Sequence, residues 1–242
     1  MVLDLMTKAK VLKELEDYIK EFNTSNDLKL SYDTIRIDFS KQHKLKKIKS
    51  LGNWKKINKS NRIIFTSLRK KIIDDEVTSV YQLEDYNIFY YNSNKDKPRY
   101  RLATMVIFGL KQYHKEPTPH HIIEDILSIL KNITSVDLCY DMKQKPNIDN
   151  LKGNFRTRQY LTKEKVKTDT HYINNTNILM LDRVCIYNKA KKNDLKGRLY
   201  RIEATISIPN IKALALPLHE FKDIVKLLVP FNIKRLRPKD TL

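Results

Sequence analysis

Glycine is scarce in this chain of 242 residues, with only four: Gly52, Gly109, Gly153 and Gly197. Neighbouring glycines lie more than forty positions apart. Neither the GxxxxGK[ST] phosphate loop nor the GxGxxG dinucleotide turn can therefore form. This excludes ATP or GTP hydrolysis by a phosphate loop and dinucleotide binding of the Rossmann type.

Cysteine is also rare, and the sequence lacks long apolar runs. Cys139 and Cys185 make no CxxC pair, which excludes a thiolate zinc site of that kind and provides no disulfide framework. A reducing, cytoplasmic location is expected from this cysteine usage. No run approaches the 18 or more apolar residues of a membrane span, and the charged first residues predict no signal peptide.

Positive charge is abundant: 47 Lys and Arg against 28 Asp and Glu give a net charge of +19. Twelve cations and no acid lie between Lys41 and Lys71, with Trp54 among them. Cations with an interleaved aromatic suit a phosphate backbone and its bases, although the ring could equally cap the core. The alternatives are a compositional bias toward lysine and an anionic membrane surface, but no basic amphipathic helix supports a membrane partner. The DNA-contact candidates are Lys46, Lys47, Trp54, Lys55, Lys56, Arg62, Arg156, Arg158, Arg183, Lys191 and Lys192.

Hydrophobic patterning predicts an α+β fold, with a largely antiparallel sheet and helices packed on one of its faces. We expect one helix over 8–22 with Thr7 as its N-cap, and another over 218–228. A further helix is expected to start after Thr118 as N-cap, with Pro119 as its first residue. Segment 41–71 is expected to be part loop and part helix, and 143–169 a long loop or flexible arm. The pattern over 72–86 is ambiguous. Strands are expected over 30–40, 86–91, 99–113, 133–142, 171–175, 178–189 and 198–208.

Carboxylates on two of these strands are the first candidates for chemistry. On the strand VDLCYD, Asp137, Cys139 and Asp141 point to one face by alternation. Two acids on an otherwise apolar strand need a positive partner, either a divalent cation or an arginine or lysine. If the strand of Glu203 is a neighbour, Glu203 and Asp137 could hold Mg²⁺ or Mn²⁺, which suit phosphate chemistry.

Between those strands lie two tyrosines, Tyr172 and Tyr187, each near a cation in the sequence. A phenol is a poor nucleophile because its usual pKa is about 10, and a cation beside it would favour the phenolate. His171 is a candidate metal ligand or proton carrier. No His-x-His pair occurs, so the two-histidine metal motif of many DNA-nicking enzymes is absent.

In their order along the chain, these segments resemble the rolling-circle replication initiators, in particular the trans-acting plasmid Rep proteins and the filamentous-phage replication initiation factors. The resemblance covers about residues 30–208, with Asn174–Asn175 and Asn188 departing from the family pattern. The segments that carry it are YDTIRIDF (32–39), ATMVIFGLKQY, TPHHIIEDILSILKN, VDLCYD, HYINN, IYNKAKK and LYRIEATI.

The resemblance implies a nicking-closing endonuclease, which makes a 5′-phosphotyrosyl bond and leaves a 3′-OH primer. Tyr172 would be the nucleophile, Lys189 would contact the scissile phosphate, and Asp137 and Glu203 would hold the cation, with Asp141 as a further ligand candidate. The implied partners are origin DNA, as a single strand or hairpin, a host helicase and a second copy of the chain. The implied domains are a helix over 1–29, the nicking domain over 30–230 with basic insertions at 41–71 and 143–169, and a basic tail over 231–242.

Two other functions fit the same sequence. A non-catalytic DNA-binding initiator or regulator would use the basic surface and keep its carboxylates in salt bridges. An RNA-binding or membrane-surface protein would owe its charge to composition alone.

Overall fold

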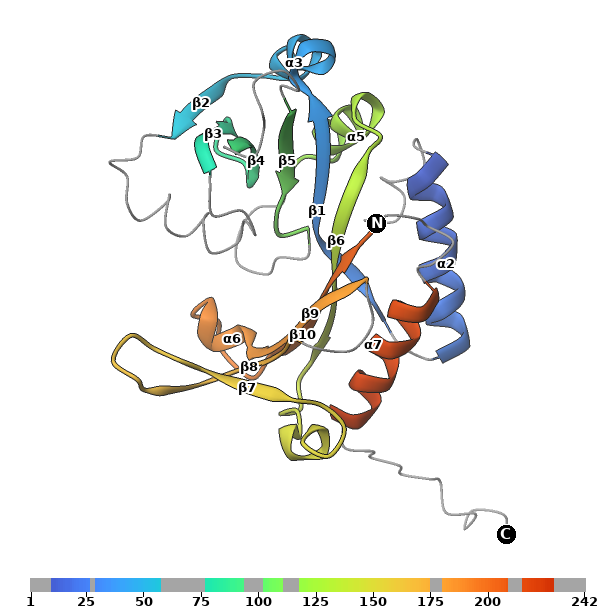
Figure 1. Cartoon of the computed structure of the whole chain (residues 1–242), viewed down its shortest axis with the longest axis vertical. Coiled ribbons are helices and arrows are strands. Elements are labelled where there is room, and N and C mark those ends of the chain that lie inside the picture. Colours follow the sequence, from blue (N-terminus) through green and yellow to red (C-terminus); the bar gives the residue numbers. More distant parts are fainter. Residues whose placement is uncertain are drawn as a thin grey trace. The chain divides into compact units, whose positions relative to one another are not determined.

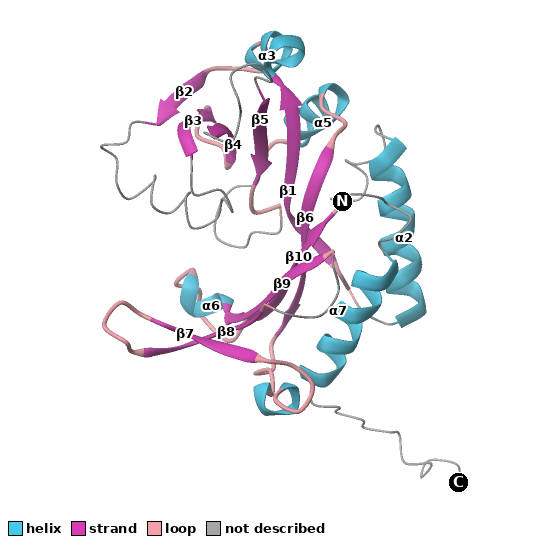
Figure 2. Cartoon of the chain, in the orientation of Figure 1, coloured by secondary structure: helices cyan, strands magenta, loops and turns pink. Residues whose placement is uncertain are grey.

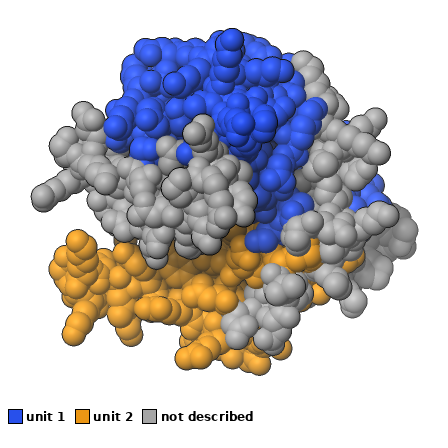
Figure 3. Space-filling model, turned by 45° about the horizontal axis from the view of Figure 1, so that its top comes forward, with its two compact units in different colours: residues 1–138, 207–211 blue, residues 139–206, 212–242 orange. Residues whose placement is uncertain are grey.

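The structure, a computed structural model, describes residues 10–26, 29–57, 77–93, 102–110, 118–174, 180–208 and 215–228. The chain forms two compact units, coloured separately in Figure 3. Unit 1 comprises Met1–Leu138 and Ser207–Ile211, and unit 2 comprises Cys139–Ile206 and Lys212–Leu242. The domain boundaries expected at residues 30 and 230 stay a prediction.

Unit 1 is built on strands hydrogen-bonded in the order β2-β3-β4-β5-β1-β6 (Figure 1). Strand β1 is buried along its middle, which explains why its β-branched and aromatic residues alternate only in part. The strands are β1 (Ser31–Ser40), β2 (Trp54–Ile57), β3 (Val77–Leu83), β4 (Ile88–Ser93), β5 (Leu102–Ile107) and the first part of β6 (Ile133–Met142). The helices are α2 (Lys10–Asn26), α3 (Lys41–Lys49) and α5 (His120–Ile129).

Unit 2 continues from β6 in the order β6-β10-β9-β8-β7 (Figure 2). Its strands are the end of β6, then β7 (Thr157–Leu161), β8 (Lys167–Ile173), β9 (Leu181–Asn188) and β10 (Tyr200–Ser207). Its helices are the 3-10 turn η1 (Ile148–Leu151), α6 (Lys189–Lys192) and α7 (Ala215–Leu228). Backbone N–H of Asn147 and the side chain of Asn150 donate to the last carbonyls of α7, at 2.9 and 3.1 Å, which satisfies that helix end.

The α+β class is confirmed, with antiparallel pairing from β2 through β5 to β1 and from β10 through β9 and β8 to β7. The hairpin of β4 and β5 and the strands β1, β6, β9 and β10 lie where the sequence predicts them. The segment 72–86, which the sequence left ambiguous, contains β3. Thr7, Arg62 and the tail over 231–242 lie outside the described residues.

Three expectations about local structure are corrected. Helix α5 begins at His120 after an extended Pro119, so Thr118 is not its N-cap. Helix α7 begins at Ala215 and accepts Pro217 in its first turn, where the missing N–H costs no hydrogen bond. Segment 143–169 is not a long loop, because it contains η1, β7 and the start of β8. The strands in this segment form because their backbones pair with neighbouring strands. The residues of the segment show little periodicity by themselves.

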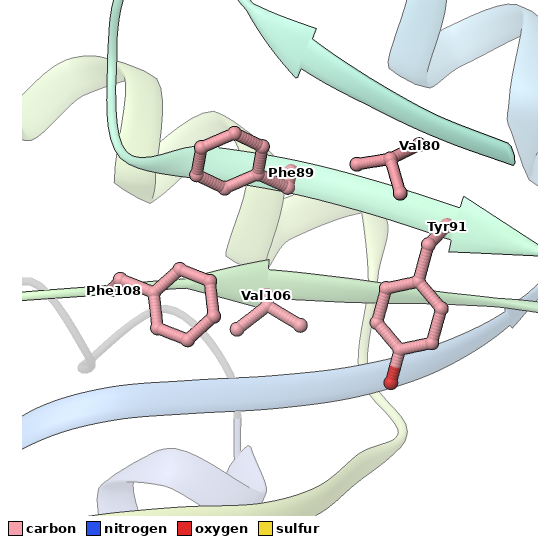
Figure 4. Packing of buried hydrophobic residues seen from close by; sticks show 5 residues of the cluster. All are labelled: Val80, Phe89, Tyr91, Val106 and Phe108. Atoms are coloured by element: carbon pink, nitrogen blue, oxygen red, sulfur yellow. The ribbon is translucent and has the colours of Figure 1, made fainter. Parts of the chain in front are cut away.

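A compact apolar cluster stabilises the outer strands of unit 1. Val80, Phe89, Tyr91, Val106 and Phe108 pack together, with Ile57 against them (Figure 4). Cross-strand register places Val80 opposite Tyr91 and Phe89 opposite Val106, so these side chains share one face. The rings of Phe89 and Phe108 meet at 5.9 Å between centroids, a favourable edge contact.

Buried ion pairs stabilise the two central aspartates of β6. In unit 1, Arg36 of β1 donates to both carboxylate oxygens of Asp137, each at 3.0 Å. In unit 2, Arg201 of β10 donates to both oxygens of Asp141, at 2.6 and 2.8 Å. Both pairs are almost completely buried. Of the positive partners expected for these carboxylates, the structure shows arginine for both Asp137 and Asp141.

Removing one partner of the Arg36–Asp137 pair should be strongly destabilising. We expect Asp137→Asn to lower the free energy of unfolding by about 3–5 kcal/mol, because it leaves a buried, uncompensated guanidinium. Urea unfolding measures this change. The control is Asp85→Asn, because the exposed Lys55–Asp85 pair at 3.2 Å should contribute less than about 1 kcal/mol. Equal losses for the two variants would contradict a buried counter-ion role for Asp137.

Candidate active site and nucleic-acid interface

One face of the unit 2 sheet carries a continuous row of polar side chains. Strand register pairs Arg158 with Tyr172, Tyr172 with Cys185, and Cys185 with Glu203. Residues directly opposite one another on paired strands point to the same face. This row therefore crosses β7, β8, β9 and β10, and we call its face the tyrosine face.

A second row lies beside the first on the tyrosine face. Tyr187 and Arg201, paired across β9 and β10, each lie two residues from the first row. The phenolic hydroxyl of Tyr187 donates to a carboxylate oxygen of Glu203 at 3.0 Å. A guanidinium nitrogen of Arg201 lies 4.0 Å from the same oxygen. The Lys192 ammonium lies 4.2 Å from the centre of the Tyr187 ring, within the range of a cation–π contact.

Tyr172 has a different environment from Tyr187. Its ring makes an edge contact with Tyr160 at 6.4 Å between centroids, and the Arg183 guanidinium lies 5.9 Å from its centroid. Burial is the main cause that raises the pKa of Tyr172 to about 12, the Cys185 thiol adds to the rise, and Arg183 opposes it. Tyr172 is partly exposed, whereas Tyr187 is buried. Of the two phenols, Tyr172 is the more accessible to a ligand.

The thiol of Cys185 lies between Tyr172 and Glu203 in the first row. Burial first, and then the Glu203 carboxylate, raises its pKa to about 12, against the opposing charges of Lys192 and Arg183. The thiol therefore stays protonated at neutral pH and is no nucleophile there.

His171 does not share the tyrosine face. It comes directly before Tyr172 on β8, so alternation turns it to the other face, and it pairs with Gln159 and Ile186. Burial lowers the pKa of His171, and the Asp169 carboxylate opposes this change. Further lowering comes from Lys145 and Lys152. The alternation of a strand thus separates His171 from its sequence neighbour Tyr172.

The carboxylates proposed as metal ligands are engaged by other side chains in this structure. Asp137 and Asp141 each accept hydrogen bonds at both carboxylate oxygens from one arginine, so each carboxylate already has a positive partner. Glu203, 18% exposed at its side chain, has one oxygen bonded to Tyr187. Among the residues that the structure describes, no three His, Cys, Asp or Glu side chains form a metal-binding group. Binding of Mg²⁺ or Mn²⁺ stays a prediction.

The predicted phosphate-binding lysine, Lys189, opens α6 and is buried. Its neighbours Lys191 and Lys192 are exposed. The Asn188 side chain accepts from the Lys191 backbone N–H at 2.9 Å and caps this short helix. The exposed pair therefore presents the charge of α6 to solvent, next to the ring of Tyr187.

The other DNA-contact candidates fall on two surfaces. In unit 1, Lys46 and Lys47 of α3 and Lys55 and Lys56 of β2 are exposed. In unit 2, Arg156 and Arg158 are exposed at β7, and Arg183 is half-buried on β9.

Trp54 packs into the fold of unit 1. Its indole N–H donates to the Ile48 carbonyl at 2.9 Å, and its ring lies 4.9 Å from Tyr90. This geometry supports the capping role of the ring over base stacking.

Three important residues lie outside the set that sequence reasoning selected. Arg36 and Arg201 pair with the β6 aspartates, and Tyr160 contacts Tyr172. The two arginines could have been found as lone cations between apolar residues in the strands TIRIDF and LYRIEAT. A cation at such a position is buried and needs an acid as partner. Tyr160 has no comparable signal, since its role follows from the pairing of β7 with β8.

Comparison with known proteins gives a structural likeness but no sequence match. No family model matches the chain, and no curated protein matches it. Among solved structures, the chain is similar to the rolling circle replication initiator protein from Geobacillus stearothermophilus. The sequence identity is 14% and the TM-score 0.48, over 82% of this chain and 80% of that chain.

Within the described part of the chain, no helix is both long enough and apolar enough to cross a membrane.

The raised pKa values on the tyrosine face predict how stability depends on pH. The Cys185 thiol has an ordinary pKa of 9.0 and the Tyr172 phenol one of 10.0, and both rise to about 12 in the folded protein. Above pH 9 the unfolded chain therefore loses protons that the folded chain keeps. The contribution of these two groups to the free energy of unfolding is fully present below pH 9 and is lost as the pH rises to about 12. Urea midpoints from pH 8 to 11 measure this fall.

Cys185→Ser should reduce that fall, because a serine hydroxyl does not ionise in this range. For each of the two proteins, the urea midpoint at pH 11 is compared with that protein's own midpoint at pH 8. A fall of the same size in both proteins would contradict a protonated Cys185 thiol in the fold.

Proposed function

We propose that the protein is a replication initiator that cuts and rejoins one DNA strand through a tyrosine on the tyrosine face. The observation that carries this proposal is the grouping of two phenols, a carboxylate and several cations on one face. Tyr172, Tyr187 and Glu203 lie there, with Arg183 and Lys192 beside the rings. The reaction itself comes from the resemblance of the ordered motifs to rolling-circle initiators.

In the proposed step, the Tyr172 oxygen forms a bond to the scissile phosphorus and the bond from phosphorus to the 3′ oxygen breaks. The phenolic proton passes to a base, and the departing 3′ oxygen takes up a proton. A 5′-phosphotyrosyl bond and a 3′-OH primer result. The reverse attack by a 3′-OH rejoins the strand and frees the phenol.

Tyr172 suits the nucleophile better than Tyr187. A scissile phosphate must reach the phenolic oxygen, and Tyr172 is the more exposed of the two. Arg183 lies near its ring and favours the phenolate, which burial otherwise opposes. The hydroxyl of Tyr187 is already bonded to Glu203, which suits a residue that holds Glu203 in place.

Tyr172→Phe should abolish covalent capture of DNA and leave DNA binding within about twofold, since one hydroxyl contributes little to a contact dominated by phosphates. The measurement uses single-stranded oligonucleotides of random sequence, labelled at the 3′ end so that the 5′-linked product is visible. They are incubated with Mg²⁺ or Mn²⁺ and separated on a denaturing gel.

Tyr187→Phe is the matched control, because it removes a hydroxyl from the same face. It should retain capture at a reduced rate. Capture by Tyr172→Phe together with its loss in Tyr187→Phe would move the nucleophile to Tyr187. Capture by both variants would rule out a nucleophile at either position.

A non-catalytic DNA-binding initiator or regulator is the second candidate. The arginine pairs on Asp137 and Asp141 favour it, because such pairs serve structure without chemistry. Intact DNA and no protein-linked band from the natural chain, with either metal, would support this candidate.

The exposed lysines of unit 1 should supply part of the DNA affinity. Replacing Lys46, Lys47, Lys55 and Lys56 by Gln should reduce the slope of log affinity against log salt by about 3 to 4, if each neutralises one phosphate. Fluorescence anisotropy with a labelled oligonucleotide measures the slope. An unchanged slope would show that this surface does not contact DNA.

A further inference from the structure

The β7–β8 ribbon, residues 156–173, is an unusual element at the edge of the unit 2 sheet. The two strands pair from Thr157–Ile173 to Leu161–Lys167, and β7 is the last strand in the sheet order. Figure 1 shows them in yellow, running side by side to the loop that joins them.

Hydrogen bonds fix the tip of this ribbon. Backbone N–H of Thr162 donates to the Val166 carbonyl at 2.9 Å, and that of Lys165 donates to the Thr162 carbonyl at 3.0 Å. Further along, the Thr168 hydroxyl donates to the Tyr160 carbonyl at 2.9 Å. Side chains at the tip are therefore presented on an ordered frame, which lowers the entropy lost on binding.

Large apolar side chains are exposed on the ribbon. Tyr160 is 42% exposed, Leu161 45% and Val166 59%, and among the described residues these are the large hydrophobic side chains that solvent reaches most. Leu161 and Val166 flank the tip of the ribbon, where exposed apolar side chains are available for contact with another molecule.

The charge of the ribbon identifies the kind of partner. Over residues 156–173 the sequence has five Lys and Arg against two acids, Glu164 and Asp169. A second copy of the chain would bring two such cationic surfaces together, which disfavours self-association through the ribbon. A polyanion that also offers apolar groups suits it. The cations are Arg156, Arg158, Lys163, Lys165 and Lys167.

We propose that the β7–β8 ribbon binds double-stranded DNA in the major groove, beside the strand that the tyrosine face cuts. A two-stranded β-ribbon fits the width of that groove, where thymine methyl groups offer apolar contacts. The cations contact phosphates, while Leu161 and Val166 contact thymine methyls. This inference rests on the proposed function, because the ribbon would bind the duplex next to the single strand that the tyrosine face cuts.

The ribbon itself carries part of the tyrosine face, because Arg158 and Tyr172 lie on β7 and β8. Tyr160 of the ribbon contacts the Tyr172 ring, and Arg158 pairs across the strands with Tyr172. A duplex held by the ribbon therefore lies next to the candidate nucleophile. This position suits an origin whose flanking duplex is read while an adjacent strand is cut.

The charge contribution is tested with Lys163→Gln and Lys165→Gln in one variant of the full chain. The probe is a 30-base-pair duplex of AT-rich mixed sequence, and fluorescence anisotropy gives affinity over a range of salt concentrations. The slope of log affinity against log salt should fall by about 2, the value for two lost phosphate contacts. Lys222→Gln with Lys226→Gln, the same charge change on α7, is the control and should leave the slope unchanged.

Groove contact is tested with Leu161→Ser and Val166→Ser in one variant. The natural chain is tested on this duplex and on the same duplex with uracil in place of thymine. Its affinity for the uracil duplex should be about fourfold lower for each thymine that it contacts, because each such contact loses one buried methyl group. The variant should bind both duplexes equally. Equal binding of the two duplexes by the natural chain would overturn the major-groove contact.

Capture of single strands separates this inference from the proposed function. Both ribbon variants should still form the covalent link to a single-stranded oligonucleotide, because Tyr172 is intact. Unchanged duplex affinity and salt slope in both variants would overturn the ribbon inference, as would a change of oligomeric state in sedimentation without any loss of duplex binding. The result for Tyr172→Phe decides the proposed function independently of either outcome.

Discussion

The two aspartates of β6 impose the main physical constraint on this protein. Asp137 and Asp141 lie on the same side of the strand, and each is buried where an unpaired carboxylate would be very costly. A two-point contact with an arginine compensates each charge, from Arg36 in unit 1 and from Arg201 in unit 2. The neighbouring strand in each unit must then present its arginine at the matching position, so the pairs specify strand register as well as charge.

In unit 2 this constraint extends to the candidate chemistry. Arg201 holds Asp141 and lies 4.0 Å from Glu203, and Glu203 accepts the hydrogen bond from Tyr187. The charges of β6, β10 and β9 are thus linked from one strand to the next. Such a network holds its side chains in fixed positions, which favours a preorganised site over an adaptable one.

In the proposed function, the tyrosine face would cut the strand and the ribbon would bind the duplex beside it. The first row supplies a partly exposed phenol with arginine nearby, while the ribbon supplies cations and exposed apolar groups at a sheet edge. Edge strands commonly carry charge to prevent unwanted pairing with other chains. Exposed apolar side chains do not give this protection, so Tyr160, Leu161 and Val166 are the reason that a partner is inferred.

Much of the fold could be predicted from local pattern. The apolar alternation and the β-branched residues located β1, β6, β9 and β10, and the apolar spacing located α5 and α7 to within a few residues. Strand β7 was missed because TRQYL has weak alternation and gains its order from β8. The acids, the two tyrosines and the cations of the candidate site could be named from residue type. Their partners could not be identified, because Arg36 lies 101 positions from Asp137 and Arg201 lies 60 from Asp141.

By itself the sequence determined the α+β class, the net charge of +19 and the set of groups able to do chemistry. These follow from residue type and short-range periodicity, which need no knowledge of distant contacts. Tertiary structure alone decided that the β6 carboxylates meet arginines, that Tyr187 bonds to Glu203, and that His171 lies on the opposite face from Tyr172. The physical reason is that strand register sets which side chains meet, and register is fixed by pairing between segments far apart in the chain.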